Sequence, residues 1–129
     1  MKSILEVIKL NRLVSEWREN NNTIALVPTM GRLHSGHISL IKEAKILASK
    51  TVVSIFVNPI QFGRGEDYES YPSNIESDKK KLEKEEVDIV FIPDLKQLYP
   101  MGIDTDTRIT VPYISEILCG QHRPGHFSG

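Results

Sequence analysis

The stretch Met30-Gly31-Arg32-Leu33-His34-Ser35-Gly36-His37 follows closely on the apolar run Ile-Ala-Leu-Val at residues 24–27. This order predicts a strand, a tight glycine turn and the start of a helix. The first amides of a helix have no intrahelical partners and lie at the positive end of the helix dipole, so anions bind there. The stretch therefore predicts a site for the phosphates of a nucleotide.

Two glycines and two histidines supply the chemistry of this predicted site. Gly31 permits the backbone to turn out of the strand, and Gly36 has no Cβ that would block a phosphate or a nucleotide ring lying against the main chain. His34 and His37 are three residues apart, so both rings can donate hydrogen bonds to one phosphate as charge builds on it. The alternative is a structural histidine pair beside an ordinary loop, and the order of strand, glycines and helix favours the functional interpretation.

Composition narrows the class of protein. The chain has 129 residues, of which 40% are hydrophobic and 26% charged, and its formal net charge is -1. One α/β domain is expected at this length, and near-neutral charge argues against a nucleic-acid partner bound by bulk charge. The lysines at 79–81 are followed by glutamates at 83, 85 and 86, which is typical of a solvated helix face.

Cysteine usage and hydropathy indicate the compartment. Cys119 is the single cysteine, so the chain has no internal disulfide. The sequence has neither a signal-like apolar segment at its start nor a run of membrane-spanning length. These features predict a cytoplasmic protein without a membrane partner.

Short apolar runs and helical patterns alternate along the chain. The runs lie at residues 24–27, 52–57, 89–92 and 109–111, and they lack the polar alternation of half-exposed strands. Residues 3–19 are expected to form an amphipathic helix opened by Ser3, with Glu6 three residues on. Its apolar stripe is expected to comprise Val7, Leu10, Val14 and Trp17. Further helices are expected after His34, with a buried stripe at Leu40, Ile41, Ala44, Leu47 and Ala48, and around Asn74. The pattern predicts an α/β fold with a parallel sheet.

Prolines and polar residues gather at the predicted ends of these runs. Proline cannot continue a central strand, and it falls at or just beyond the end of each run, at Pro28, Pro59, Pro93 and Pro112. Ligands of open α/β folds bind at this carboxyl edge of the sheet. Asn58 and Gln61 follow the second run and offer both donors and acceptors to a small polar substrate. An ordinary turn is the alternative for Asn58, and proximity to the histidine turn favours the binding role.

Four segments together carry a family resemblance. They are residues 27–37, with Val-Pro-Thr-Met-Gly and His-Ser-Gly-His; 56–62, Phe-Val-Asn-Pro-Ile-Gln-Phe; 66–72, with Glu-Asp-Tyr and Tyr-Pro; and 118–127, with Leu-Cys-Gly and Arg-Pro-Gly-His-Phe. The set closely resembles the N-terminal part of the pantothenate synthetase family, also called the pantoate–β-alanine ligases. The HxGH histidine motif is shared with other nucleotidyltransferases and with class I aminoacyl-tRNA synthetases, and the segments at 58–62 and 123–127 are more specific.

The resemblance implies both a fold and a reaction. The fold would be the Rossmann-like, doubly wound parallel sheet of the HxGH nucleotidyltransferase superfamily. The reaction would use ATP and magnesium: pantoate attacks the α-phosphorus to give pantoyl adenylate and pyrophosphate, and the amine of β-alanine then displaces AMP. In-line attack at phosphorus needs positioning and charge stabilisation more than a protein nucleophile. His34 and His37 would supply that stabilisation.

The resemblance also assigns site residues. Pro28, Met30, Gly31 and Gly36 would contact the nucleotide together with the two histidines. Gln61 would hold pantoate with Asn58 beside it, and Tyr71, Arg123 and His126 would line the second-substrate end. An arginine fork pairs both oxygens of a carboxylate, and a surface salt bridge is the alternative for Arg123. Of the acidic residues that would hold magnesium in relatives, only Asp78 aligns, so the metal ligands stay open. Ser73 and Arg32 depart from the family pattern, which has arginine and a small residue there.

The length of the chain also departs from the family pattern. Family chains are roughly twice as long and end in a small domain that closes over the site. Residues 1–129 are therefore expected to be an incomplete N-terminal nucleotide- and pantoate-binding domain, with little turnover alone, taken from a homodimeric enzyme. Two alternatives remain: another HxGH nucleotidyltransferase, which does not account for residues 58–62 and 123–127, and a non-catalytic binding or assembly module.

Overall fold

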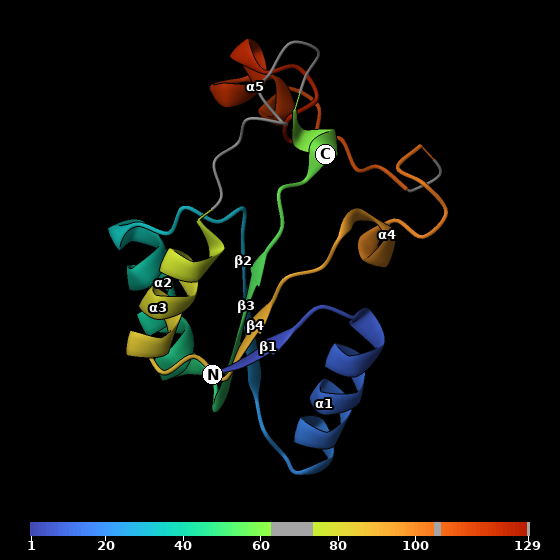
Figure 1. The fold of residues 1–129 in the computed structure, drawn as a ribbon. Helices are drawn as coiled ribbons and strands as arrows, with labels where there is room; N and C mark the ends of the chain where they lie inside the picture. Colours follow the sequence, from blue (N-terminus) through green and yellow to red (C-terminus); the bar gives the residue numbers. More distant parts are fainter. Residues whose placement is uncertain (63–73, 105–106, 129) are drawn as a thin grey trace.

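A parallel β-sheet forms the centre of the molecule (Figure 1). The structure is a computed structural model that describes residues 1–62, 74–104 and 107–128. Within these ranges the sheet has four strands in the order β1-β4-β3-β2: β1 (Lys2–Ile4), β2 (Ile24–Thr29), β3 (Lys50–Ile55) and β4 (Ile89–Phe91). The helices are α1 (Val7–Glu19), α2 (Ser35–Leu47), α3 (Ile75–Lys84), α4 (Leu95–Leu98) and α5 (Cys119–His122), with 3-10 turns η1 (Pro59–Gln61) and η2 (Ile114–Glu116).

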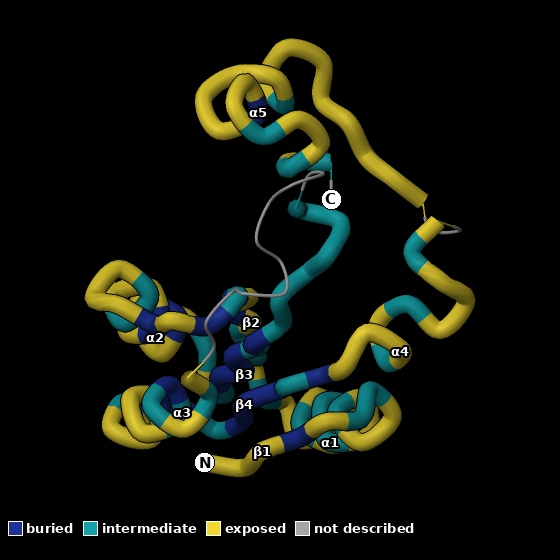
Figure 2. Tube along the Cα trace, turned by 45° about the horizontal axis from the view of Figure 1, so that its top comes forward, coloured by how far each residue is buried: buried dark blue, intermediate teal, exposed yellow. Residues whose placement is uncertain are grey.

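Helices cover both faces of the sheet, which confirms the predicted doubly wound arrangement. Figure 1 shows α2 and α3 on one face and α1 on the other. Successive side chains of a strand point to opposite faces, so β3 contributes Val53 and Ile55 to the core under α2 and α3, and Val52 to the core under α1. The middle strands β3 and β4 are the most deeply buried part of the trace in Figure 2.

The prediction for the N-terminus is wrong at its start. Residues 2–4 form strand β1 and not the first turn of a helix, since they pair in parallel with β4 and bury Ile4 to 5% exposure. The helix begins only at Val7, because Glu6 has an extended backbone. From there the predicted stripe is confirmed at Val7, Leu10 and Trp17, which pack on the sheet, whereas the fourth packed residue of α1 is Leu13 and not Val14.

The prediction of a strand at residues 109–111 is also wrong. These residues belong to no helix or strand, and Ile109 and Val111 are 77% and 46% exposed. The edge of β4 that does not face β3 is occupied by β1, so the fourth strand comes from the opposite end of the chain. An apolar run alone did not distinguish a paired strand from an extended surface segment.

The prediction that Pro28 marks the end of a strand is wrong. Pro28 lies inside β2, opposite Ser54, and not at the end of the strand. Proline is tolerated there because β2 is an edge strand of the described sheet.

In α2, Ile41 and Ala44 are buried as predicted, whereas Leu40 and Leu47 are exposed.

Helix α3 starts where the sequence predicted. The side chain of Asn74 accepts a hydrogen bond from the backbone N–H of Ser77 at 3.0 Å, which caps the helix. In the part of the chain that the structure describes, no helix is both long and apolar enough to cross a membrane.

Candidate functional site

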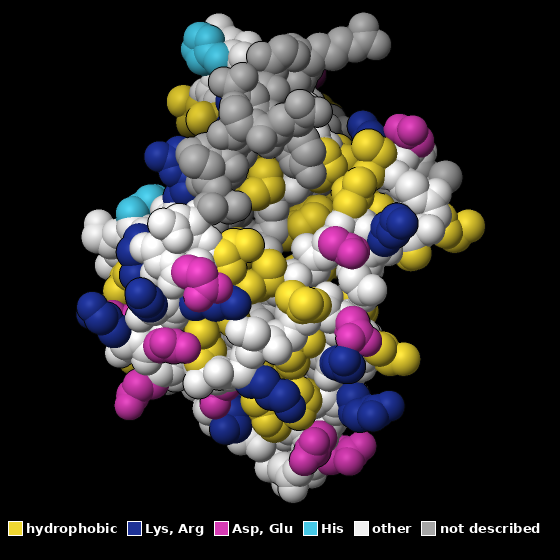
Figure 3. Space-filling model, in the orientation of Figure 1, with side chains coloured by type: hydrophobic (Ala, Val, Ile, Leu, Met, Phe, Trp, Pro, Cys, Tyr) yellow, Lys and Arg dark blue, Asp and Glu magenta, His cyan; other side chains and the backbone are white. Residues whose placement is uncertain are grey.

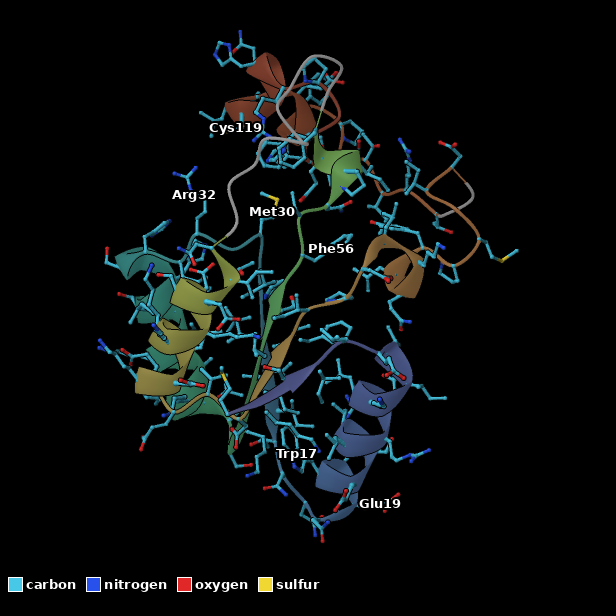
Figure 4. All side chains as sticks on the ribbon, viewed as in Figure 1. Trp17, Glu19, Met30, Arg32, Phe56 and Cys119 are labelled. Carbon is cyan, nitrogen blue, oxygen red and sulfur yellow. The ribbon has the colours of Figure 1, made fainter. Side chains whose placement is uncertain are left out.

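A cavity of about 600 Å³ lies where the carboxyl ends of β2, β3 and β4 meet. Five residues predicted from the sequence line it: Pro28, Met30, His37, Asn58 and Gln61. The rest of the lining is mostly apolar and comes from Leu10, Leu26, Thr29, Ser54, Phe56, Phe91, Pro93 and Leu98. Figure 4 shows Met30 and Phe56 at the ends of neighbouring strands, and in Figure 3 apolar side chains gather on the middle of this view of the molecule. The predicted edge of the sheet therefore carries a concave site.

The turn between β2 and α2 has an unusual backbone. Gly31 and Arg32 have φ values of 84° and 53°, so two successive residues are in the left-handed region. Glycine adopts this conformation readily, whereas arginine does so at a steric cost. The N–H of Gly31 donates to the Thr29 hydroxyl at 3.2 Å. Figure 4 shows the Arg32 side chain pointing away from α2 and α3.

A buried carboxylate on α3 holds the same turn. Asp78 is 1% exposed, and its Oδ2 and Oδ1 accept the N–H groups of Arg32 and Leu33 at 2.8 and 2.9 Å. Lys81 donates from Nζ to the Leu33 carbonyl at 2.6 Å, and its Nζ lies 3.8 Å from Asp78 Oδ1. The lysine segment at 79–81 is therefore not only a solvated face, because Lys81 reaches the turn.

The two histidines form a reciprocal cap at the start of α2. His34 is the N-cap residue, and its Nδ1 accepts the N–H of Gly36 at 3.1 Å. His37 Nδ1 in turn accepts the N–H of His34 at 3.3 Å, and the ring centroids are 4.1 Å apart. Because each Nδ1 accepts a hydrogen bond, we assign the proton of each neutral ring to Nε2. The prediction that the rings lie together is confirmed, and each offers an Nε2–H donor.

The structure adds a second reason for glycine at position 36. A Cβ at Gly36 would lie 3.0 Å from Cε1 and 3.1 Å from Nδ1 of His34, so the residue makes room for an imidazole. The N–H of Gly36 is also engaged by that ring. The capping box also directs the N–H of His37 to the His34 ring, so in the first turn of α2 helix geometry leaves the N–H of Ser35 for an anion. A direct contact of Gly36 with a nucleotide stays a prediction.

Burial tunes His37 more than charge does. Desolvation lowers the pKa of His37 below its usual 6.5, the neighbouring His34 lowers this pKa further, and the Asp78 carboxylate raises it. A lowered pKa keeps the ring neutral at pH 7. The neutral ring retains the Nδ1 lone pair that the N–H of His34 requires.

The turn after β3 is held by residues that are distant in sequence. Asn58 Oδ1 accepts the N–H of Ile60 at 3.2 Å and the hydroxyl of Tyr99 at 3.2 Å, which caps η1. The ring of His126 donates from Nδ1 to the carbonyl of Gln61 at 2.9 Å. The first contacts orient the side-chain amide of Asn58, and the last holds the backbone at Gln61. Among the described residues, Asn58 and Gln61 are the two that line the cavity with side-chain amides.

Arg123 and His126 lie behind this turn and do not line the cavity as the structure describes it. The Arg123 guanidinium lies 5.5 Å from the centre of the Phe62 ring, an arrangement typical of a cation–π contact. Their roles toward a second substrate stay predictions. Tyr71 and the rest of the segment at 66–72 lie outside the described residues.

Sequence reasoning missed the roles of Asp78 and Tyr99. For Asp78 a signal existed: it stands on the stripe of α3 between Ile75 and Leu82, where a carboxylate predicts a specific buried partner. Tyr99 had no such signal, because its contact with Asn58 spans 41 residues.

Asp78 does not fit a magnesium ligand. Both of its oxygens already accept backbone N–H groups, and the residue is buried. Across residues 1–62, 74–104 and 107–128, no group of three or more His, Cys, Asp or Glu side chains could hold a metal ion.

Comparison with known proteins identifies the family of this chain. The sequence model described as pantoate-beta-alanine ligase matches residues 2–129. The chain belongs to the pantoate-beta-alanine ligase family. This confirms the resemblance that the four sequence segments carried.

Relatives within the pantoate-beta-alanine ligase family are similar over the whole chain. The pantothenate synthetase of Alteromonas mediterranea is 49% identical over 129 residues, which are 100% of this chain and 46% of the relative. That of Vesicomyosocius okutanii is 52% identical over the same length, 45% of its own. The chain thus spans about half the length of the curated relatives it matches.

Solved structures of the family share the fold. The pantoate-beta-alanine ligase of Francisella tularensis, complexed with beta-gamma ATP and beta-alanine, has a TM-score of 0.89 at 42% identity and covers 100% of this chain and 49% of its own. The pantothenate synthetase of Thermus thermophilus has a TM-score of 0.80 at 37% identity, covering 99% of this chain and 44% of its own. These likenesses confirm the predicted Rossmann-like α/β fold.

Proposed function

We propose that the protein containing this chain is an ATP-dependent pantoate–β-alanine ligase that forms pantothenate through a pantoyl adenylate. One observation carries the proposal: two imidazoles stand together at a helix start, each held at Nδ1 by a backbone N–H, and His37 lines a cavity with Asn58 and Gln61. Family membership supports it, as does the Francisella relative, which was solved with beta-gamma ATP and beta-alanine.

The reaction has two balanced steps. A carboxylate oxygen of pantoate forms a bond to the α-phosphorus of ATP, and the bond from that phosphorus to the bridging oxygen breaks, which releases pyrophosphate. The amine of β-alanine then bonds to the acyl carbon, the bond from that carbon to the AMP oxygen breaks, and the amine loses a proton. Neither step needs a protein nucleophile.

In the first step the histidines stabilise negative charge. The Nε2–H groups of His34 and His37, with the N–H of Ser35 at the start of α2, donate to phosphate oxygens as charge builds on them. The rings are fixed in advance by their Nδ1 contacts, so little reorganisation accompanies the reaction. Both residues therefore act as electrostatic catalysts and not as bases.

The remaining predicted residues divide between the substrates. Pro28, Met30 and Gly31 contact the nucleotide along the end of β2, and Gly36 supports it through the His34 ring. Gln61 holds pantoate by its side-chain amide, with Asn58 beside it. Tyr71, Arg123 and His126 line the second-substrate end of the site. There the guanidinium of Arg123 pairs with the carboxylate of β-alanine.

We extend the proposal to the setting of the whole protein. It acts in the cytoplasm as a homodimer on small molecules, without a nucleic-acid or membrane partner. The net charge of -1 and the single cysteine support this setting. Magnesium enters bound to ATP, because magnesium commonly rests on substrate phosphates. Sedimentation of the full-length protein as a monomer would contradict the homodimer.

Pantoate-dependent exchange between ATP and labelled pyrophosphate tests the function in the full-length protein. His37→Ala is expected to lower the exchange rate by about 100-fold or more, because a preorganised donor is lost. Gln61→Ala is expected to raise the KM for pantoate more than the KM for ATP. His122→Ala is the matched control, because His122 is exposed on α5, and its exchange rate should stay within about twofold.

Two results would overturn the proposal. Exchange that needs no pantoate would indicate another nucleotidyltransferase. A parental exchange rate in His37→Ala would exclude the role assigned to that ring.

A further inference from the structure

The turn that carries the histidines contains an anion-binding arrangement filled by the protein itself. Successive backbone N–H groups in a turn with left-handed residues form a concave nest for a negative group. Here the N–H groups of Arg32 and Leu33 converge on the carboxylate of Asp78, at 2.8 and 2.9 Å. A phosphate therefore does not occupy this nest. The histidine rings and the start of α2 are the groups that remain to bind the phosphate.

The nest also explains how the backbone tolerates its conformation. A non-glycine residue in the left-handed region, such as Arg32 with its φ of 53°, carries a steric cost and persists where the surroundings impose it. Asp78 imposes it from a separate helix, 46 residues away in sequence. Its burial is compensated by the two N–H donors and by the nearby Lys81 ammonium.

The clamp connects to the histidines through one residue. Leu33 is 2% exposed and is fixed at its N–H by Asp78 and at its carbonyl by Lys81. His34 follows it directly and begins the reciprocal cap with His37. The position of both rings thus depends on the placement of the backbone at residues 32–33.

We propose that Asp78 is a positioning residue for adenylate formation, which clamps the turn at residues 31–33 so that both imidazoles present Nε2–H to the reacting phosphate. Lys81 is its auxiliary. The inference rests on the proposed function, because it assigns a purpose to rings that act in that reaction. It gives the acidic residue a role other than binding metal.

The test compares two carboxylates in the full-length protein. Asp78→Asn keeps the side-chain shape but offers an NH₂ group to one of two N–H donors. Asp88→Asn is the matched control, because Asp88 accepts the N–H of Thr51 at 2.9 Å and pairs with Lys50 at 3.2 Å, away from the cavity lining. Lys81→Met is a milder variant on the surface of α3.

Pantoate-dependent pyrophosphate exchange at a temperature where every variant is folded gives the first readout. Asp78→Asn is expected to lower kcat by about tenfold or more with little change in the KM for ATP, since transition-state placement is lost. Lys81→Met should lower kcat in the same direction by less, and Asp88→Asn should stay within about twofold. Parental kcat in Asp78→Asn, or an equal loss in Asp88→Asn, would overturn the proposal.

Imidazole ¹⁵N spectra give a second readout that does not require turnover. The parent is expected to show the Nε2–H form at His34 and His37, and Asp78→Asn a mixture of tautomers at one or both. Unchanged tautomers in Asp78→Asn would overturn the clamp. Absence of exchange in the parent, with the tautomer change present, would instead overturn the proposed function alone.

Discussion

At the residue scale, each histidine at the start of α2 separates two tasks between its ring nitrogens. Nδ1 holds the main chain, and Nε2 carries the proton that a phosphate oxygen would accept. Protonation of Nδ1 would remove the acceptor from the cap, so the chemistry and the local fold favour the same neutral ring. The glycine between the two histidines is needed for this arrangement, because the His34 ring fills the space of a Cβ.

The lowered pKa of His37 predicts a titration below pH 6.5, which ¹H–¹³C spectra of the imidazole would follow. His34→Ala should raise the midpoint, and Asp78→Asn should lower it, because these neighbours act in opposite directions. As the pH falls, His37 takes up a proton in the unfolded chain before it does so in the folded chain. The stability that the neutral His37 ring contributes is therefore lost as the pH falls from 6.5 toward the lowered pKa. A midpoint at or above 6.5, or shifts of the same sign in both variants, would contradict the prediction.

Gly36→Ala should separate activity from stability. Alanine stabilises a helix by up to about 1 kcal/mol relative to glycine, and this gain offsets the loss from a weakened cap. The free energy of unfolding, measured by thermal denaturation, should therefore change by no more than about 1 kcal/mol. The new methyl group displaces the His34 ring, so pyrophosphate exchange should fall about tenfold or more. Exchange at the parental rate would show that the ring tolerates the methyl group.

At the element scale, local units were predictable and distant pairings were not. The unit of β2, turn and α2 is written in adjacent residues, so Gly31 and the histidine pair could be found from sequence. The strand β1 could not, because its three residues become a strand only beside β4, some 87 residues later. The same limit applies to the site: the contacts of Asp78 with Leu33 and of His126 with Gln61 span 45 and 65 residues.

A pair of isoleucines tests the corrected strand assignment. Ile4→Ala should lower the free energy of unfolding by about 2–5 kcal/mol, because it removes a buried side chain between α1 and the sheet. Ile109→Ala is the control and should cost less than about 0.5 kcal/mol, since Ile109 is 77% exposed. Urea unfolding monitored by circular dichroism measures both, and equal costs would contradict the burial described for β1.

At the scale of the whole molecule, the cavity is bounded on one side by an edge strand. Leu26 of β2 lines the cavity and is 61% exposed, and the family relatives are about twice as long. We expect residues 1–129 alone to form pantothenate at least about 100-fold more slowly than the full-length protein, because water is not excluded from the site. A coupled assay for AMP release measures this, and equal turnover by the two polypeptides would contradict it.

The Asp78 carboxylate should also slow hydrogen exchange in the histidine turn. Amide hydrogens in connecting segments normally exchange with deuterium quickly, because their hydrogen bonds open locally. The N–H groups of Arg32 and Leu33 are instead shielded by Asp78, a residue on another helix, and Leu33 is almost fully buried. Their deuterium uptake should therefore be as slow as that of the central strands even without nucleotide, which would mark the turn as built before any substrate arrives.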